Sequence, residues 1–156
     1  VRGPKKHQRP DNNKDCGGRF EVVSLGHRYQ SDIAEFTFDG VPYRSDQEAI
    51  WLSSLYAMLE GASYALEISR DDIGGALSWN AEHRRGIVLS GTDPGGAGAA
   101  KKIAENVGVV VEAAVKRVSD CDCGEETSCY GCLRTYRNAR DHERLSRGAA
   151  LRLLSL

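Results

Sequence analysis

The sequence has no apolar run long enough to cross a membrane, and its opening residues do not form a secretory signal peptide. Without an export signal we expect a cytoplasmic protein that has no membrane partner and keeps its cysteines reduced. Residues 1–18 lack apolar periodicity and are rich in Lys, Asn, Gly and Pro, which predicts a disordered tail or linker before a domain over 19–156. Val1 in place of Met indicates a fragment, an excised domain or an alternative start codon.

An excess of charge of one sign is also lacking, because 21 Lys and Arg nearly balance 22 Asp and Glu. A formal net charge of −1 gives the whole chain no attraction for nucleic acid, so any such contact needs a local basic patch. The segment TDPGGAGAAKK lies between a predicted strand and a predicted helix, where phosphate-binding loops occur, but it lacks their Gly-Lys-Ser/Thr sequence. We interpret its glycines as a tight connection from a strand to a helix.

The apolar pattern predicts an α+β fold in which a mixed or antiparallel sheet packs on two long helices. Strands are expected at 19–26 and 32–40, joined as a hairpin, and at 64–69 and 86–92, with a strand or hairpin connection over 70–85. Helices are expected at 45–63, 97–119 and 141–156. Ser45 and Asp141 are the expected caps, Gly61 the expected stop, and Gly108 the expected bend of the second helix.

Four of the five cysteines lie within the twelve residues CDCGEETSCYGC, with the spacing C-x-C-x5-C-x2-C. Two disulfides would need an oxidising compartment, and a redox C-x-x-C motif would not need a second pair beside it. A structural zinc ion needs four ligands in a small tetrahedron, and the turn-forming Gly131 suits the second pair. We favour zinc over the disulfide and redox alternatives. Cys16 is expected to be a free thiol, and His142 a polar residue of the last helix.

Arginine is concentrated after the cysteines, whereas the cysteine segment itself is acidic. These arginines could neutralise the metal cluster and donate to its sulfurs, form a solvated helix face, or contact nucleic-acid phosphates. We favour the first two roles over the third. The candidates for phosphate contact are Arg134, Arg137, Arg140 and Arg144.

Four stretches together resemble the MrfA-type zinc-binding domain, formerly a domain of unknown function, at the C-terminus of superfamily 2 helicases. They are LGHRYQSDIAEFTF, EAIWLSSLYAMLEGASYALEISRDDIGGAL, IVLSGTDPGGAGAAKKIAE and CDCGEETSCYGCLRTYRNARDHERLSRGAALRLL. The resemblance covers residues 20 to 155 and implies a structural Zn²⁺ held by Cys121, Cys123, Cys129 and Cys132. It also implies an accessory, non-enzymatic module of a protein in DNA repair or phage defence. The implied partners are helicase motor domains in cis, a helicase subunit in trans, and DNA.

The sequence contains neither Gly-Lys-Ser/Thr nor a D-E-x-H box, so we expect no ATP hydrolysis or unwinding by this chain alone. Two other functions stay open at this point. One is an interaction module that docks a helicase subunit without touching DNA. The other is a thiol oxidoreductase, which would turn over in an insulin-reduction assay and hold no tightly bound metal.

Overall fold

The computed structural model describes residues 8–9, 11–16, 23–24, 26, 30–41, 47–79, 85–93 and 98–156. The first predicted strand and its hairpin lie mostly outside these residues, as does Ser45. Gln8 and Asp15 form an isolated antiparallel bridge, and the linker over 1–18 stays a prediction. Among the described residues, no helix combines the length and the apolar character needed to cross a membrane.

The sheet is antiparallel, as the sequence allowed, and has the strand order β1-β3-β2. Its strands are β1 (Ile33–Thr37), β2 (Ile73–Trp79) and β3 (Arg85–Gly91). The pairing aligns Ala34, Leu89 and Gly75 across the three strands. Ala34 and Leu89 are buried, and a side chain at Gly75 would begin 2.7 Å from Leu55 Cδ1, so this face packs closely against a helix.

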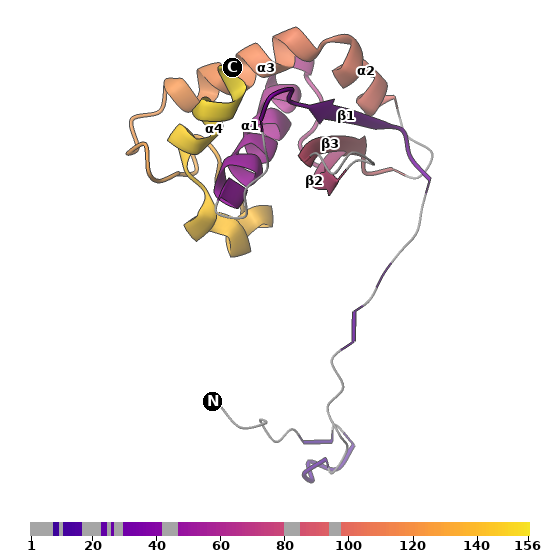
Figure 1. Cartoon of the computed structure of the whole chain (residues 1–156). Helices are drawn as coiled ribbons and strands as arrows, with labels where there is room; N and C mark the ends of the chain where they lie inside the picture. The colour runs from indigo at the N-terminus through magenta and orange to yellow at the C-terminus, as the bar shows by residue number, and fades with distance from the viewer. Residues whose placement is uncertain are drawn as a thin grey trace.

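That helix is α1 (Glu48–Leu66), which is buried nearly all round, as its apolar sequence predicts. Figure 1 shows α1 in the middle of the domain, with the sheet on one side and α4 (Arg147–Leu154) on the other. The predicted stop at Gly61 and the strand predicted over 64–69 are wrong. The helix continues to Leu66 and ends at Glu67, which adopts the left-handed conformation at φ 52°.

Gly61 is instead the place where another helix crosses α1. An added Cβ atom would lie 2.6 Å from the carbonyl oxygen of Val110 and 2.8 Å from the amide nitrogen of Ala114. Only a residue without a side chain leaves room for these two backbones to meet. The glycine is therefore required by a contact between helices and not by a turn.

The second predicted long helix is divided into α2 (Ala99–Glu105) and α3 (Val107–Ser119). The break lies at Asn106 (φ −124°, ψ 30°), so the expected bend at Gly108 is wrong by two residues. The side-chain amide of Asn106 donates to Lys102 O at 2.8 Å, which satisfies a carbonyl that the break leaves free. α3 then buries Val110, Ala114 and Val118.

The C-terminal helix begins later than predicted. A 3₁₀ helix, η2 (Tyr136–Arg144), precedes α4, and Ser146 caps α4 by accepting from Ala149 N at 3.0 Å. Asp141 is therefore not the cap. Leu145, Ala149 and Leu153, which are spaced four residues apart, are all buried against the core.

Asp141 is buried and accepts a hydrogen bond from the hydroxyl group of Tyr56, at 2.8 Å. Burial, followed by this bond to the carboxylate, raises the pKa of Tyr56 to about 12. The bond joins α1 to η2, two elements that lie far apart in the sequence.

Tyr56→Phe is expected to lower the free energy of unfolding by about 1–2 kcal/mol, because it leaves the Asp141 carboxylate without its hydroxyl donor. Urea unfolding followed by circular dichroism measures the change. Tyr64→Phe is the matched control, since Tyr64 lies exposed on the same helix, and it should change the value by less than about 0.5 kcal/mol. Equal effects of the two changes would contradict a structural role for the bond.

Candidate metal centre

The four clustered cysteines bring their sulfur atoms to one point between α3 and η2. All four Sγ atoms lie within 4.8 Å of one another. The distances are 3.5 Å from Cys121 to Cys123, 3.4 Å from Cys121 to Cys129, 3.7 Å from Cys123 to Cys132, and 3.9 Å from Cys129 to Cys132. Every sulfur therefore has at least two sulfur neighbours.

These separations fit a single tetrahedral zinc ion. Zn–S bonds of about 2.3 Å place the sulfurs of a regular tetrahedron about 3.8 Å apart. A disulfide needs a sulfur separation of about 2.05 Å, and all five cysteines are free thiols in this structure. The geometry thus suits the metal and not the two disulfides that the sequence left open.

The Cys129–Cys132 turn owes its shape to backbone hydrogen bonds. The carbonyl of Cys129 accepts from the amides of Leu133 at 3.1 Å and Arg134 at 2.9 Å, and thus closes the turn. Two other amides point at sulfur: Gly131 N lies 3.3 Å from Cys129 Sγ, and Cys129 N lies 3.2 Å from Cys132 Sγ. Such donors stabilise the thiolates that a metal requires.

The thiols differ in acidity because they differ in these surroundings. The hydrogen bond from the Cys121 thiol lowers the pKa of Cys129 to about 7, and the Gly131 amide adds to this effect. Burial, together with hydrogen bonds to neighbouring thiols, raises the pKa of Cys123 to about 12. Burial also raises the pKa of Cys132. Of these three thiols, Cys129 alone has a lowered pKa.

Two arginines fasten the cysteine segment to the helices on either side. Arg147, the first residue of α4, donates through Nε to Cys123 O and through Nη1 to Val118 O of α3, the latter at 3.3 Å. Arg117 of α3 donates through Nε to Cys132 O at 2.8 Å. The expected arginine support of the cluster therefore reaches the carbonyls of the cysteines. Arg117 was not predicted, because it precedes the cysteines and lies in a helix of mixed composition.

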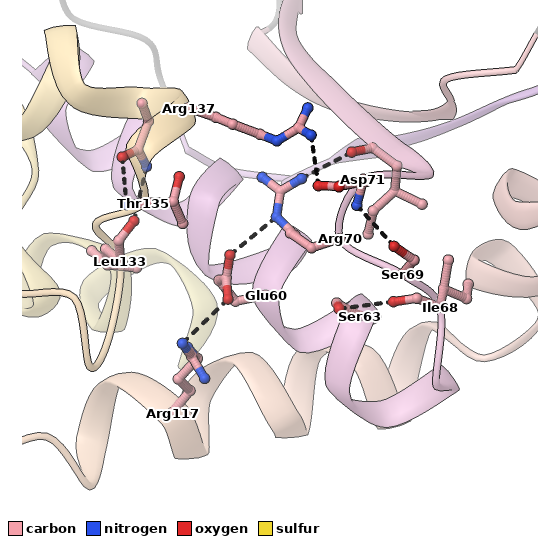
Figure 2. A network of polar contacts seen from close by, with 12 residues as sticks. Glu60, Ser63, Ile68, Ser69, Arg70, Asp71, Arg117, Leu133, Thr135 and Arg137 are labelled. Atoms are coloured by element: carbon pink, nitrogen blue, oxygen red, sulfur yellow. Dashed lines mark hydrogen bonds and ion pairs between the residues drawn. The ribbon is translucent and has the colours of Figure 1, made fainter.

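Arg117 belongs to a polar network that reaches the sheet. Glu60 of α1 lies 3.2 Å from Arg117 and 3.0 Å from Arg70, and Arg70 donates to Ile73 O at 2.9 Å. Figure 2 shows Glu60 between the two arginines. The start of β2 and the cysteine turn are thus linked through one carboxylate.

Each of the four predicted phosphate-binding arginines has a protein partner, although that of Arg140 is distant. Arg134 donates to Ser128 Oγ at 3.0 Å. Arg137 pairs with Asp71 at 2.6 Å (Figure 2), and Arg144 pairs with Glu48 at 2.8 Å. Arg140 approaches Asp141 at 3.8 Å only, and its side chain is 89% exposed.

His142 lies outside the sulfur cluster. Its Nε2 atom is 3.0 Å from both Thr135 O and Asn138 Oδ1, and its ring meets the ring of Tyr130 edge to face. The sequence predicted His142 in the first turn of the last helix, but the residue lies in η2. Its role is to hold the polypeptide that follows the cysteines.

A family model, the MrfA Zn-binding domain, matches residues 55–133, just over half of the chain. The chain belongs to the MrfA Zn-binding domain family. The match ends immediately after the last clustered cysteine, and zinc is the cofactor of this family. The donor set and the sulfur spacing of this member agree with that metal. No curated protein matches the chain.

The fold of this MrfA Zn-binding domain is similar to part of two solved helicase structures. One is the DUF1998 helicase MrfA bound to DNA, with a TM-score of 0.61, 19% identity, and coverage of 96% of this chain and 20% of that chain. The other is the same helicase bound to DNA and AMPPNP, with a TM-score of 0.61, 16% identity, and coverage of 97% and 19%. The chain thus spans about a fifth of the length of these helicases.

Proposed function

We propose that this chain is a non-catalytic zinc-binding module of a helicase-like protein of DNA repair or phage defence. Cys121, Cys123, Cys129 and Cys132 hold the Zn²⁺ ion. The observation that carries the proposal is the convergence of four sulfurs at tetrahedral spacing, at the end of the family match. Zinc content before and after the substitution Cys129→Ser tests it.

The role proposed for the zinc is structural. Four thiolates fill a tetrahedral shell, whereas catalytic zinc sites keep a position open for water or substrate. The ion would fasten the segment between α3 and α4, whose carbonyls already accept hydrogen bonds from Arg117 and Arg147. Such a site gives a rigid end to the fold.

The proposed partners are helicase motor domains, in cis or as a subunit in trans, in the cytoplasm. The association with motor domains is supported by the two helicase structures, in which a region similar to this chain makes up about a fifth of the polypeptide. A rigid module of this kind is suited to support motor domains that move, because its own core does not need to change.

A contact with DNA is proposed for the arginines of η2. Arg140 is the most exposed of them, and the pair between Arg137 and Asp71 is exposed on both sides, so it stabilises the fold little and can exchange for a phosphate. Arg144 lies at the end of the same helix, but Glu48 and Asp141 already pair with it. Arg134 is better placed to support the turn through Ser128 than to bind phosphate.

Arg137→Gln combined with Arg140→Gln is expected to weaken binding of a single-stranded oligonucleotide and to flatten its salt dependence. Each lost phosphate contact lowers the slope of log K against log salt by about 0.7 for a single strand. Fluorescence anisotropy at several salt concentrations measures both effects. Arg152→Gln, an exposed arginine of α4, is the control and should leave the slope unchanged. An unaltered slope in the double variant would contradict the DNA contact.

The alternative is a module that docks a helicase subunit without touching DNA. It is favoured by the protein partners that Arg134, Arg137 and Arg144 already have. Capture of a purified helicase subunit in nuclease-treated samples, together with no oligonucleotide binding, would support this alternative.

A further inference from the structure

Two tyrosines near the zinc site leave their rings in solvent. Tyr130 lies within the Cys129–Cys132 turn and is 66% exposed, and Tyr136 opens η2 and is 91% exposed. Single exposed aromatic residues are common on protein surfaces. These two are unusual because they flank the same short segment, together with the arginines of η2.

The fold holds this segment firmly. The ring of Tyr130 meets the ring of His142 at 5.4 Å between centroids and at 89°. His142 Nε2 in turn lies 3.0 Å from Thr135 O, the carbonyl directly before Tyr136. The turn around Tyr130 is closed by amides that donate to Cys129 O. Both tyrosines therefore project from backbone that is already fixed, which lowers the entropy cost of binding.

The arginines of η2 lie in the same segment of the chain as the two tyrosines. The sequence from 128 to 144 carries four arginines against Asp141 and Glu143, whereas 120–126 carries four carboxylates and no basic residue. Asp71 and Glu48, two further carboxylates beside η2, are paired with Arg137 and Arg144. The cations of η2 that a phosphate can reach are therefore Arg140, whose side chain is almost fully exposed, and Arg137, whose ion pair is exposed on both sides.

We infer that Tyr130 and Tyr136 stack against bases of a single DNA strand while Arg137 and Arg140 contact its phosphates. This inference rests on the proposed DNA contact and names the form of nucleic acid that the module takes. Aromatic rings alternating with cations are the usual means of binding single strands without sequence preference. In a duplex the base faces are already stacked, so the tyrosines would contribute to single-strand binding alone.

The test uses the whole zinc-loaded chain and three fluorescent probes of equal length: oligo(dT), an abasic oligomer and a duplex. Tyr136→Ala is expected to weaken oligo(dT) binding about tenfold, the usual effect of one lost stacking contact, and to leave abasic and duplex binding unchanged. Tyr130→Ala should act in the same direction. Tyr136→Phe retains the ring and should bind like the original protein.

Tyr64→Ala is the matched control, because Tyr64 is 76% exposed but lies on α1 beside Ala113 and Lys116 of α3, away from η2. It should not change any of the three affinities. Zinc content and circular dichroism establish that each variant is folded. A protein that prefers oligo(dT) to the abasic oligomer, and loses the preference in Tyr136→Ala, supports the inference.

Two outcomes overturn it and are distinguishable. If oligo(dT) binding depends on salt and on Arg137 and Arg140 but survives both tyrosine changes, stacking is refuted and the proposed DNA contact stands. If the original protein binds none of the three probes, the proposed DNA contact and the stacking are both refuted. The exposed tyrosines would then favour the alternative of a module that docks a protein.

Discussion

Cys129→Ser is expected to abolish tight zinc binding and to lower the melting temperature by ten degrees or more. Its sulfur lies 3.4 Å from Cys121 and 3.9 Å from Cys132, so its loss opens the proposed tetrahedron. Structural zinc contributes about 10–16 kcal/mol of apparent binding free energy in small zinc-finger peptides. Even a fraction of that value would exceed any single hydrogen bond of the fold.

The loss of structure in Cys129→Ser should be confined at first to the segment after α3. α1, α3 and the sheet supply most of the buried core, whereas residues 120–135 add only Cys132 and Leu133 as fully buried apolar members and otherwise consist of turns. Hydrogen exchange should therefore rise first in the cysteine segment, η2 and the start of α4.

Cys16→Ser is the matched control, since Cys16 is a free thiol outside the sulfur cluster. It should keep both the zinc and the melting temperature. A Cys129→Ser protein with an unaltered melting temperature would contradict the structural role of the metal, even if its zinc content fell.

Gly61→Ala is expected to destabilise the fold by about 2 kcal/mol, although alanine is the better helix former by about 1 kcal/mol. The added methyl group would lie 2.6 Å from Val110 O and 2.8 Å from Ala114 N. Both are backbone atoms of α3, which cannot move aside without shifting the whole helix. Chemical denaturation measures the change in the free energy of unfolding.

Gly108→Ala is expected to stabilise the fold, whereas the same change at Gly61 destabilises it. Gly108 also lies in a helix, but nothing lies within 4 Å of the position of its added Cβ. The helix propensity of alanine should therefore stabilise this variant by about 0.5–1 kcal/mol. If both glycine variants changed stability in the same direction, the close crossing of α1 and α3 would be in doubt.

Local patterns predicted what depends on local chemistry. Alternation along 32–40 gave β1, and the apolar density of 45–63 gave a central buried helix. The spacing of the four cysteines predicted a cluster, which the structure assembles. Each of these features needs only residues that are close in the chain.

The errors arose where a distant contact decides the role of a residue. Gly61 resembles a helix stop in the sequence, but α3 packs on it, more than forty residues later. Asp141 resembles a helix cap, but the hydroxyl of Tyr56 binds it. The pair between Arg137 and Asp71 also joins distant residues, and the sequence gave no sign of it. Arg117 gave no signal, because nothing in the sequence joins it to the carbonyl of Cys132.

The account depends on one zinc ion bound by four sulfurs, and this can be measured directly. Protein purified anaerobically from metal-replete cells should contain one zinc ion per chain by elemental analysis. X-ray absorption at the zinc edge should find four sulfur neighbours at about 2.3 Å. A protein without bound metal, or a zinc ion with nitrogen or oxygen in its shell, would contradict the assignment.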